Sequence, residues 1–251
     1  MKKQELTKNI IHYVFPPRLE GGLIPTSATA ILNGSKAILI DTGFDSQTPI
    51  LLADLAVNNI EVEAVIVTHF HDDHMEGLIH FSGIPVYGSR HFQDSLDECI
   101  PKENHARCIP STIVTEPLSL SFGQHNLTLI PFPGHSTCGI LINIDNQFLH
   151  VGDEIMFAVD GRSLLPCLDD ITKDINMHLD SLNKLKDYDK FTIIPSHGDI
   201  FSGEKLAGEI GNRLIYLNAL LRSNKNISFE DATKDCTCDF VHNKLHEHNI
   251  L

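Results

Sequence analysis

The sequence predicts an α/β (α+β) protein in which two β-sheets pack face to face between outer layers of helices, a four-layer αββα sandwich. Short apolar, β-branched runs alternate with segments of helical spacing along the chain. The strands fall into two β-rich halves, each accompanied by helices. Because no low-complexity linker or repeat separates these halves, we expect a single domain over residues 1–251 with a helical C-terminal tail from about 202 to 251.

The first half begins with a strand pair that meets at Asn33-Gly34, a dipeptide suited to the positive φ of a tight hairpin. A helix of apolar spacing follows and ends at two asparagines, and the run EAVIVTH is typical of a buried strand. The expected strands cover 28–34, 36–43, 63–69 and 84–88, and the expected helices cover 48–59, 74–81 (a helix or turn) and 90–100.

The second half contains a meander of strands around Gly123 and around the turn Asp145-Asn146. A helix with Asp169 or Asp170 as its N-cap follows, then a last strand that ends at a histidine and a long helix. The expected strands cover 118–122, 126–132, 139–144, 147–153 and 191–198, and the expected helices cover 169–188, 203–222 and two short segments within 228–251.

Composition limits the classes of partner. With 42% hydrophobic residues, a chain of 251 residues can bury a substantial core, and its net charge of -14 disfavours nucleic acid or an anionic membrane as a partner. We expect a small-molecule substrate. The N-terminus has no apolar region of signal-peptide length and no segment is long enough to span a membrane, which favours a cytoplasmic location. The oligomeric state stays open.

The six cysteines are expected to be reduced in that compartment. Cys236 and Cys238 form a C-x-C pair, but no second pair at zinc-finger spacing accompanies it. We therefore expect no metal at this pair.

The stretch THFHDDH, residues 68–74, holds three histidines and two acids, the side chains that bind divalent metals. In an extended loop His69 and His71 point to the same side and can reach one ion. Asp73 and His74 are displaced where the chain turns, so they aim at a neighbouring position. This segment supplies too few ligands to complete either position, and further ligands must come from elsewhere in the chain.

Candidates for the missing ligands each follow a predicted strand. His135 comes after NLTLIPF, Asp153 after QFLHV, and His197 after KFTII. Asp41 follows ILI in the same way, at a turn that Gly43 opens. Single residues of this kind are common in ordinary turns, but five strand-end segments that each deliver His or Asp indicate one shared site.

Taken together, the ordered set resembles the metallo-β-lactamase superfamily of hydrolases. Thr68 to Gly77 match its motif T-H-x-H-x-D-H-x-x-G in full, and the later Gly-His, Gly-Asp and Ser-His-Gly elements follow in the family's order, so that the resemblance covers about 28–198. It implies a metallo-β-lactamase-type sandwich with a two-metal site, in which Asp41 orients the ligands. The implied ligands are His69, His71 and His135 for one metal, Asp73, His74 and His197 for the other, and Asp153 for both.

The resemblance implies a binuclear metallo-hydrolase of a small ester, thioester or lactone, which uses a hydroxide bridging two divalent ions with Asp73 as the group that orients it or accepts its proton. Zinc is the expected metal, with Mn²⁺ or Fe²⁺ as alternatives. The substrate stays open. Glyoxalase II enzymes of the superfamily would carry basic and tyrosine residues just after the bridging acid and near the C-terminus, and its lactonases would carry a tyrosine shortly after that acid, where this chain has Met156 and Phe157. We expect these two side chains to line the substrate pocket.

Two other functional classes remain. Members resembling persulfide dioxygenases share the same histidines and acids, but they hold a single iron with the equivalents of His69, His135 and Asp153 and activate oxygen in place of water. A non-catalytic binding protein on the same fold is the second alternative.

Overall fold

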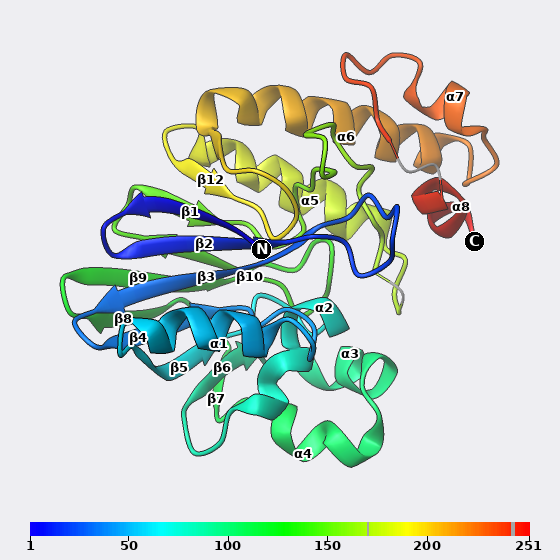
Figure 1. Ribbon diagram of the computed structural model, residues 1–251. Coiled ribbons are helices and arrows are strands. Elements are labelled where there is room, and N and C mark those ends of the chain that lie inside the picture. Colours follow the sequence, from blue (N-terminus) through cyan, green and yellow to red (C-terminus); the bar gives the residue numbers. More distant parts are fainter. Residues whose placement is uncertain (170, 242–243) are drawn as a thin grey trace.

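The computed structural model describes residues 1–169, 171–241 and 244–251, which form two sheets with helices on their outer faces (Figure 1). The strands of the first sheet are, in spatial order, β1 (Lys2–Thr7), β2 (Ile10–Phe15), β3 (Thr26–Asn33), β4 (Lys36–Ile40), β5 (Glu61–Ile66), β6 (Val86–Ser89) and β7 (Thr112–Val114). Those of the second are β13 (Phe201–Ser202), β12 (Thr192–Ile194), β11 (Phe148–His150), β10 (Ile140–Ile144), β9 (His125–Pro131) and β8 (Leu118–Phe122).

The helices complete a four-layer arrangement, as the sequence predicts. Those of the first half are α1 (Thr48–Val57), α2 (Asp72–Met75), α3 (Phe92–Cys99) and α4 (His105–Cys108), and those of the second half are α5 (Ile175–Leu185), α6 (Leu206–Arg222), α7 (Phe229–Thr233) and α8 (Lys244–Ile250). Leu51 and Leu55 of α1 pack on the outer face of the first sheet, and Leu182 and Leu217 pack α5 and α6 on the second. Between the sheets lies an apolar layer that includes Ile38 and Ile142.

Strand direction explains why distant segments can share one site. In the first sheet β4 and β5 are parallel, so their carboxyl ends reach the same edge. In the second sheet β9 and β11 are both antiparallel to β10, while β12 is parallel to β11. These three strands therefore also end at one edge. The loops after all five strands converge there, as is usual for binding sites of layered α/β proteins.

Hairpin turns are present near both predicted dipeptides, but the first is shifted by one residue: Asn33 is the last residue of β3 and pairs with Lys36, so the loop is Gly34-Ser35. Gly34, between β3 and β4, has a φ of 59°, and Asp145 and Asn146, between β10 and β11, have φ values of 58° and 54°. Only Asp145-Asn146 has the two consecutive positive φ angles that a type I′ turn requires. The sheet, however, does not begin with the 28–43 pair, because β1 and β2 precede it. β1, KKQELT, gives a weak signal because it is a mostly polar edge strand with no buried residue, whereas β2, IIHYVF, is an apolar run outside the predicted strands.

The helix predicted over 169–188 begins later than the sequence indicated. Asp174 is its N-cap and accepts hydrogen bonds from the N–H groups of Asn176 and Met177. Asp169 instead binds the N–H groups of the residues that follow it in a turn, and Asp170 lies outside the described residues. Lys173 has a φ of 47°, which α-helical residues do not adopt, so the helix cannot extend back through it.

The C-terminal tail contains the long helix and the two short helical segments that the sequence predicts, α6, α7 and α8. Tyr216 of α6 and Phe240, in the segment after α7, pack into the core on the second sheet. Within the described residues, no helix combines the length and the apolar character that crossing a membrane requires.

Candidate metal centre

Hydrogen bonds to Asp41 hold the loop 68–74 in place. Asp41 follows β4 with a φ of 58° and is fully buried. Its Oδ1 accepts the backbone N–H of Thr68 at 2.8 Å, and its Oδ2 accepts the Thr68 hydroxyl at 2.8 Å and the Nδ1–H of His74 at 2.9 Å. One carboxylate thus holds the first and last residues of the histidine loop in a fixed orientation.

The structure brings all seven predicted ligand residues together at the shared edge. Two groups of three offer ligand atoms that lie within 4.8 Å of one another, and they coincide with the two sets that the family resemblance implies. The first group is His69, His71 and His135, and the second is Asp73, His74 and His197. A third group, His69, His74 and Asp153, connects the first two.

Asp153 lies at the centre of these groups. Its Oδ2 is 2.9 Å from Nε2 of His197 and 3.8 Å from Nε2 of both His69 and His135. Its Oδ1 is 3.5 Å from Nε2 of His74. A single carboxylate therefore faces imidazoles of both groups.

Four of the five imidazoles are held so that Nε2 faces the centre. Carbonyl oxygens only accept, so the Nδ1–H of His135 donates to the Cys167 carbonyl at 2.8 Å and that of His197 donates to the Pro25 carbonyl. His74 donates its Nδ1–H to Asp41, and His69 donates to the Thr68 hydroxyl oxygen at 3.1 Å. Such partners set the tautomer of metal-binding histidines and leave the Nε2 lone pair free. The fifth ring, His71, instead presents Nδ1, 3.2 Å from Nε2 of His135.

The electrostatics differ between the two sets. Burial lowers the pKa of His69 well below its usual range and that of His71 to about 4. Burial would also lower the pKa of His74 and His197, but the surrounding carboxylates raise that of His74 well above its usual range and that of His197 to about 9. Asp153, despite burial, has a pKa well below its usual range because of the rings of His197, His74 and His69. The acids therefore attract positive charge, and protons and metal ions compete for the same lone pairs.

The donor set fits divalent metal ions. His69 Nε2, His74 Nε2 and Asp153 Oδ1 are buried polar atoms that make no hydrogen bond within the described part of the chain. Buried polar atoms without a partner cost free energy of folding. A metal ion bound between these atoms would accept their lone pairs and remove that cost. Imidazole nitrogen with carboxylate oxygen is a combination that zinc, manganese and iron accept.

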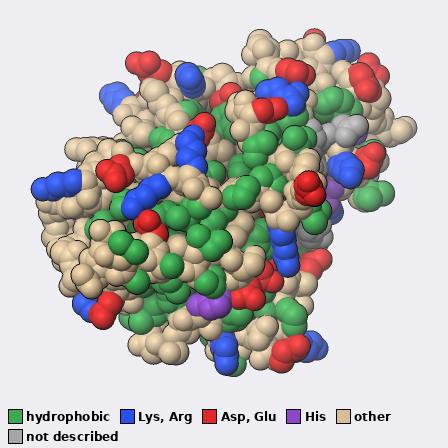
Figure 2. Space-filling model, in the orientation of Figure 1, with side chains coloured by type: hydrophobic (Ala, Val, Ile, Leu, Met, Phe, Trp, Pro, Cys, Tyr) green, Lys and Arg blue, Asp and Glu red, His purple; other side chains and the backbone are tan. Residues whose placement is uncertain are grey.

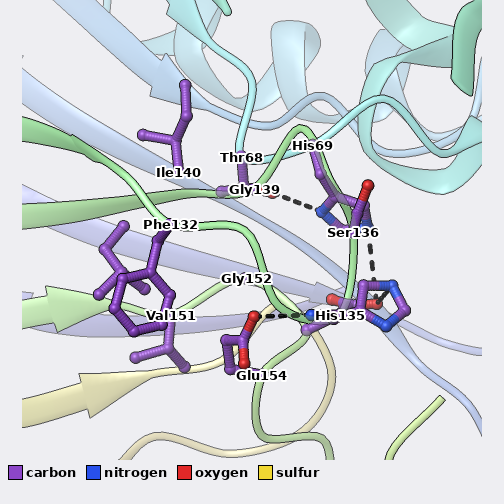
Figure 3. Close-up of a pocket in the computed structure, with 12 residues that line it drawn as sticks. Thr68, His69, Phe132, His135, Ser136, Gly139, Ile140, Val151, Gly152 and Glu154 are labelled. Carbon is purple, nitrogen blue, oxygen red and sulfur yellow. Dashed lines mark hydrogen bonds and ion pairs between the residues drawn. The ribbon is translucent and has the colours of Figure 1, made fainter. Parts of the chain in front are cut away.

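Glu154 supports this site, although the sequence did not identify it. Its Oε1 accepts the backbone N–H of His135 at 2.9 Å, as Figure 3 shows, and its Oε2 accepts the Ser181 hydroxyl at 2.6 Å. Burial raises the pKa of Glu154 to about 7. Gly134 provides the space, because a Cβ there would lie 2.2 Å from Oε1. The only sequence signal was an acid directly after Asp153.

The structure corrects the expectation for Met156 and Phe157. Met156 is 4% exposed and packs with Ala158 and Leu164. Phe157 is 9% exposed and lines a separate cavity of about 250 Å³ with Phe201, in which no member of the ligand set takes part. Both side chains are therefore buried in apolar packing.

The comparisons with known proteins agree with this geometry. A model of the metallo-beta-lactamase superfamily matches residues 21–197. A hydroxyacylglutathione hydrolase from Yersinia pestis is 32% identical over 131 residues, which are 51% of this chain and 45% of that protein, so the match spans about half the length of such curated relatives. A beta-lactamase-like protein 2 homolog from Caenorhabditis elegans is 25% identical over 93% of this chain and 77% of its own length.

Among solved structures, a metallo-beta-lactamase from Pontibacter korlensis has a TM-score of 0.70 at 19% identity and covers 86% of this chain and 98% of its own. That likeness concerns the fold alone. The family model extends from before β3 to His197 and so includes every strand end that carries a candidate ligand. The chain belongs to the metallo-beta-lactamase superfamily.

Proposed function

We propose that this protein is a binuclear metal-dependent hydrolase of a small ester, thioester or lactone. The observation that carries the proposal is the presence of two groups of three candidate ligands with Asp153 between them. The second group, Asp73, His74 and His197, supplies ligands for a second ion, which a single-iron site would leave unused. We propose zinc as the metal, with manganese or iron as alternatives.

In this proposal His69, His71 and His135 hold one ion, Asp73, His74 and His197 hold the other, and Asp153 contacts both. Ions bound there would polarise an acyl carbonyl and lower the pKa of a bound water toward neutrality. Asp41 and the backbone carbonyls behind the imidazoles keep the ligand atoms in place. These contacts would limit rearrangement of the protein during the reaction.

Asp73 is the group that we assign to proton handling. Its side chain is 18% exposed, whereas the side chains of Asp153 and His74 are 6% and 1% exposed. Its carboxylate therefore reaches toward the solvent-facing side of the centre, from which a substrate and water would approach. From there it can orient a water molecule or accept its proton.

A covalent route through cysteine has little support. Cys138 lies three residues after His135, but it is fully buried, and its Sγ accepts the backbone N–H of Phe70 at 3.3 Å. Burial raises the pKa of its thiol, which disfavours the nucleophilic thiolate. No nucleophile other than water is needed at a binuclear centre.

The proposed substrate class is a small, neutral or weakly charged acyl compound. The name of the Yersinia relative refers to hydrolysis of an acylglutathione, which supports an acyl bond as the target. The net charge of -14 disfavours polyanionic substrates, and on the face in Figure 2 lysine and arginine side chains are interspersed with acidic ones. We further propose that the protein acts in the cytoplasm.

The test measures metal content, hydrolysis and oxygen uptake on the same preparation, purified without added metal. We expect two divalent ions per chain and hydrolysis of a panel of thioesters, esters and lactones. Asp153→Asn should bind fewer than two ions and lose most of the hydrolytic rate, because its amide nitrogen cannot act as a ligand. One iron per chain with oxygen uptake on a persulfide, and no hydrolysis, would overturn the proposal in favour of a dioxygenase. Metal-free protein with neither activity would favour a binding protein.

A further inference from the structure

The position of His135 depends on a carbonyl group that lies in an irregular segment. The Nδ1–H of His135 donates to the Cys167 carbonyl at 2.8 Å. Residues 165–169 belong to neither a helix nor a strand, so no ladder of backbone hydrogen bonds fixes the direction of that carbonyl. Something else must hold the two peptide planes around Cys167.

The C-terminal helix α8 provides this restraint through Asn249. The Asn249 Oδ1 accepts the backbone N–H of Leu168 at 2.9 Å, and its Nδ2 donates to the Pro166 carbonyl at 2.7 Å. These two groups lie immediately on either side of Cys167. Both bonds are buried, since Asn249 has no exposed surface. The side-chain amide of Asn249 therefore holds the residues before and after Cys167, whose carbonyl accepts the hydrogen bond from His135.

The Asn249 amide is itself held in one orientation. Its Nδ2 also donates to the Tyr216 hydroxyl oxygen at 3.1 Å. On the other side of the segment, the His248 Nε2–H donates to the Leu168 carbonyl at 2.9 Å. Swapping the oxygen and nitrogen of the amide would place like groups against both Leu168 and Pro166. The Leu168 N–H and the Pro166 carbonyl therefore suffice to specify the orientation of the amide.

We propose that Asn249 is a positioning residue for the metal centre, which acts through the Cys167 carbonyl to keep His135 as the Nδ1–H tautomer with Nε2 directed at the ion. This inference rests on the proposed function, in which His135 is a metal ligand. It assigns a role to the C-terminal helix, which lies outside the segment that the family model matches. Loss of an outer contact of this kind lowers metal affinity about 10- to 100-fold.

The test compares Asn249→Ala with a matched control, His246→Ala. His246 is on the same helix, is 5% exposed, and bonds Tyr216 and the Ile227 carbonyl but not the 166–168 segment. Both variants should lower the free energy of unfolding. Only Asn249→Ala should lower the affinity for one zinc ion by about 10- to 100-fold in competition with a chromophoric chelator.

A second measurement is independent of metal. In metal-free protein, the ring nitrogen shifts of His135 by ¹⁵N NMR should report the Nδ1–H tautomer in the wild type and in His246→Ala, and a mixture of tautomers in Asn249→Ala. Equal zinc affinity in the two variants, or an unchanged His135 tautomer in Asn249→Ala, would overturn the inference. If Asn249→Ala does not fold, Asn249→Ser replaces it. A wild type that binds no zinc would refute the proposed function, while the tautomer measurement would still decide the role of Asn249.

Discussion

Replacing Asp41 with asparagine tests how the second group of candidate ligands is oriented. Asparagine tolerates the positive φ of this position and has the same shape as aspartate, so the backbone can stay in place. It differs in offering one acceptor oxygen where the carboxylate offers two. In the native protein those two oxygens accept from the Thr68 N–H, the Thr68 hydroxyl and His74 Nδ1–H.

The geometry leaves the asparagine with two unfavourable orientations. If its oxygen keeps the Thr68 N–H, its amide nitrogen faces His74 Nδ1, and His74 can accept that hydrogen bond only by moving its own proton to Nε2. Nε2 could then no longer bind an ion. If the amide is turned around, the buried Thr68 N–H is left unsatisfied, at a cost of about 1–3 kcal/mol. In the first orientation we expect the affinity for one ion to fall about 10- to 100-fold, which corresponds to about 1.4–2.8 kcal/mol.

The assay is a chelator competition titration of zinc, combined with urea unfolding of the metal-free protein. Asp145→Asn is a matched control, because Asp145 also has a φ of 58° and binds a backbone N–H, of Asn126, and a histidine Nδ1, of His125, in a hairpin turn. The control should bind zinc as the wild type does. Wild-type affinity for both ions in Asp41→Asn would refute the reasoning.

Three further predictions follow from the described contacts. His71→Ala should lose metal while its metal-free form melts as the wild type does, because His71 is only half-buried; full metal content would remove it from the ligand set. Replacing Cys236 and Cys238 together with serine should leave metal stoichiometry unchanged, since neither belongs to a candidate metal group of the described residues; a lost equivalent would contradict this. Burial, and then the charge of His150, lowers the pKa of His12 from 6.5 to about 3, so between about pH 6 and the folded-state pKa of about 3 the unfolded chain binds a proton that the folded chain does not. The free energy of unfolding should therefore fall with decreasing pH by about 1.4 kcal/mol per unit from this residue, and an unaltered slope in urea melts of His12→Asn would exclude it.

The site residues that could be predicted from sequence are those that stand next to recognisable local patterns. Asp41, His135, Asp153 and His197 each follow an apolar strand within a few residues, and strands are recognised by period and composition. Their convergence follows from strand direction, which the layered architecture sets. The structure places all of them at one edge, together with the 68–74 loop.

The remaining parts depend on contacts that leave no periodic signal. Asn249 bonds Leu168 across 81 positions, and a lone asparagine in a short helix gives no indication of that partner. Asp174 was missed as the N-cap because Asp169 and Asp170 are equally good capping residues, and only the backbone at Lys173 decides between them. Such choices are made by tertiary packing, which a single sequence does not display.

The candidate ligands come from loops of both sheets, so metal affinity depends on how well the two sheets pack together. The 68–74 loop follows a strand of one sheet, whereas His135, Asp153 and His197 follow strands of the other. Bound ions would act as a cross-link between them, and an ion at 100 times its dissociation constant would add about 2.7 kcal/mol to the free energy of unfolding. By the same linkage, loosening the apolar layer between the sheets, for example with Ile142→Ala, would weaken metal binding without touching a ligand.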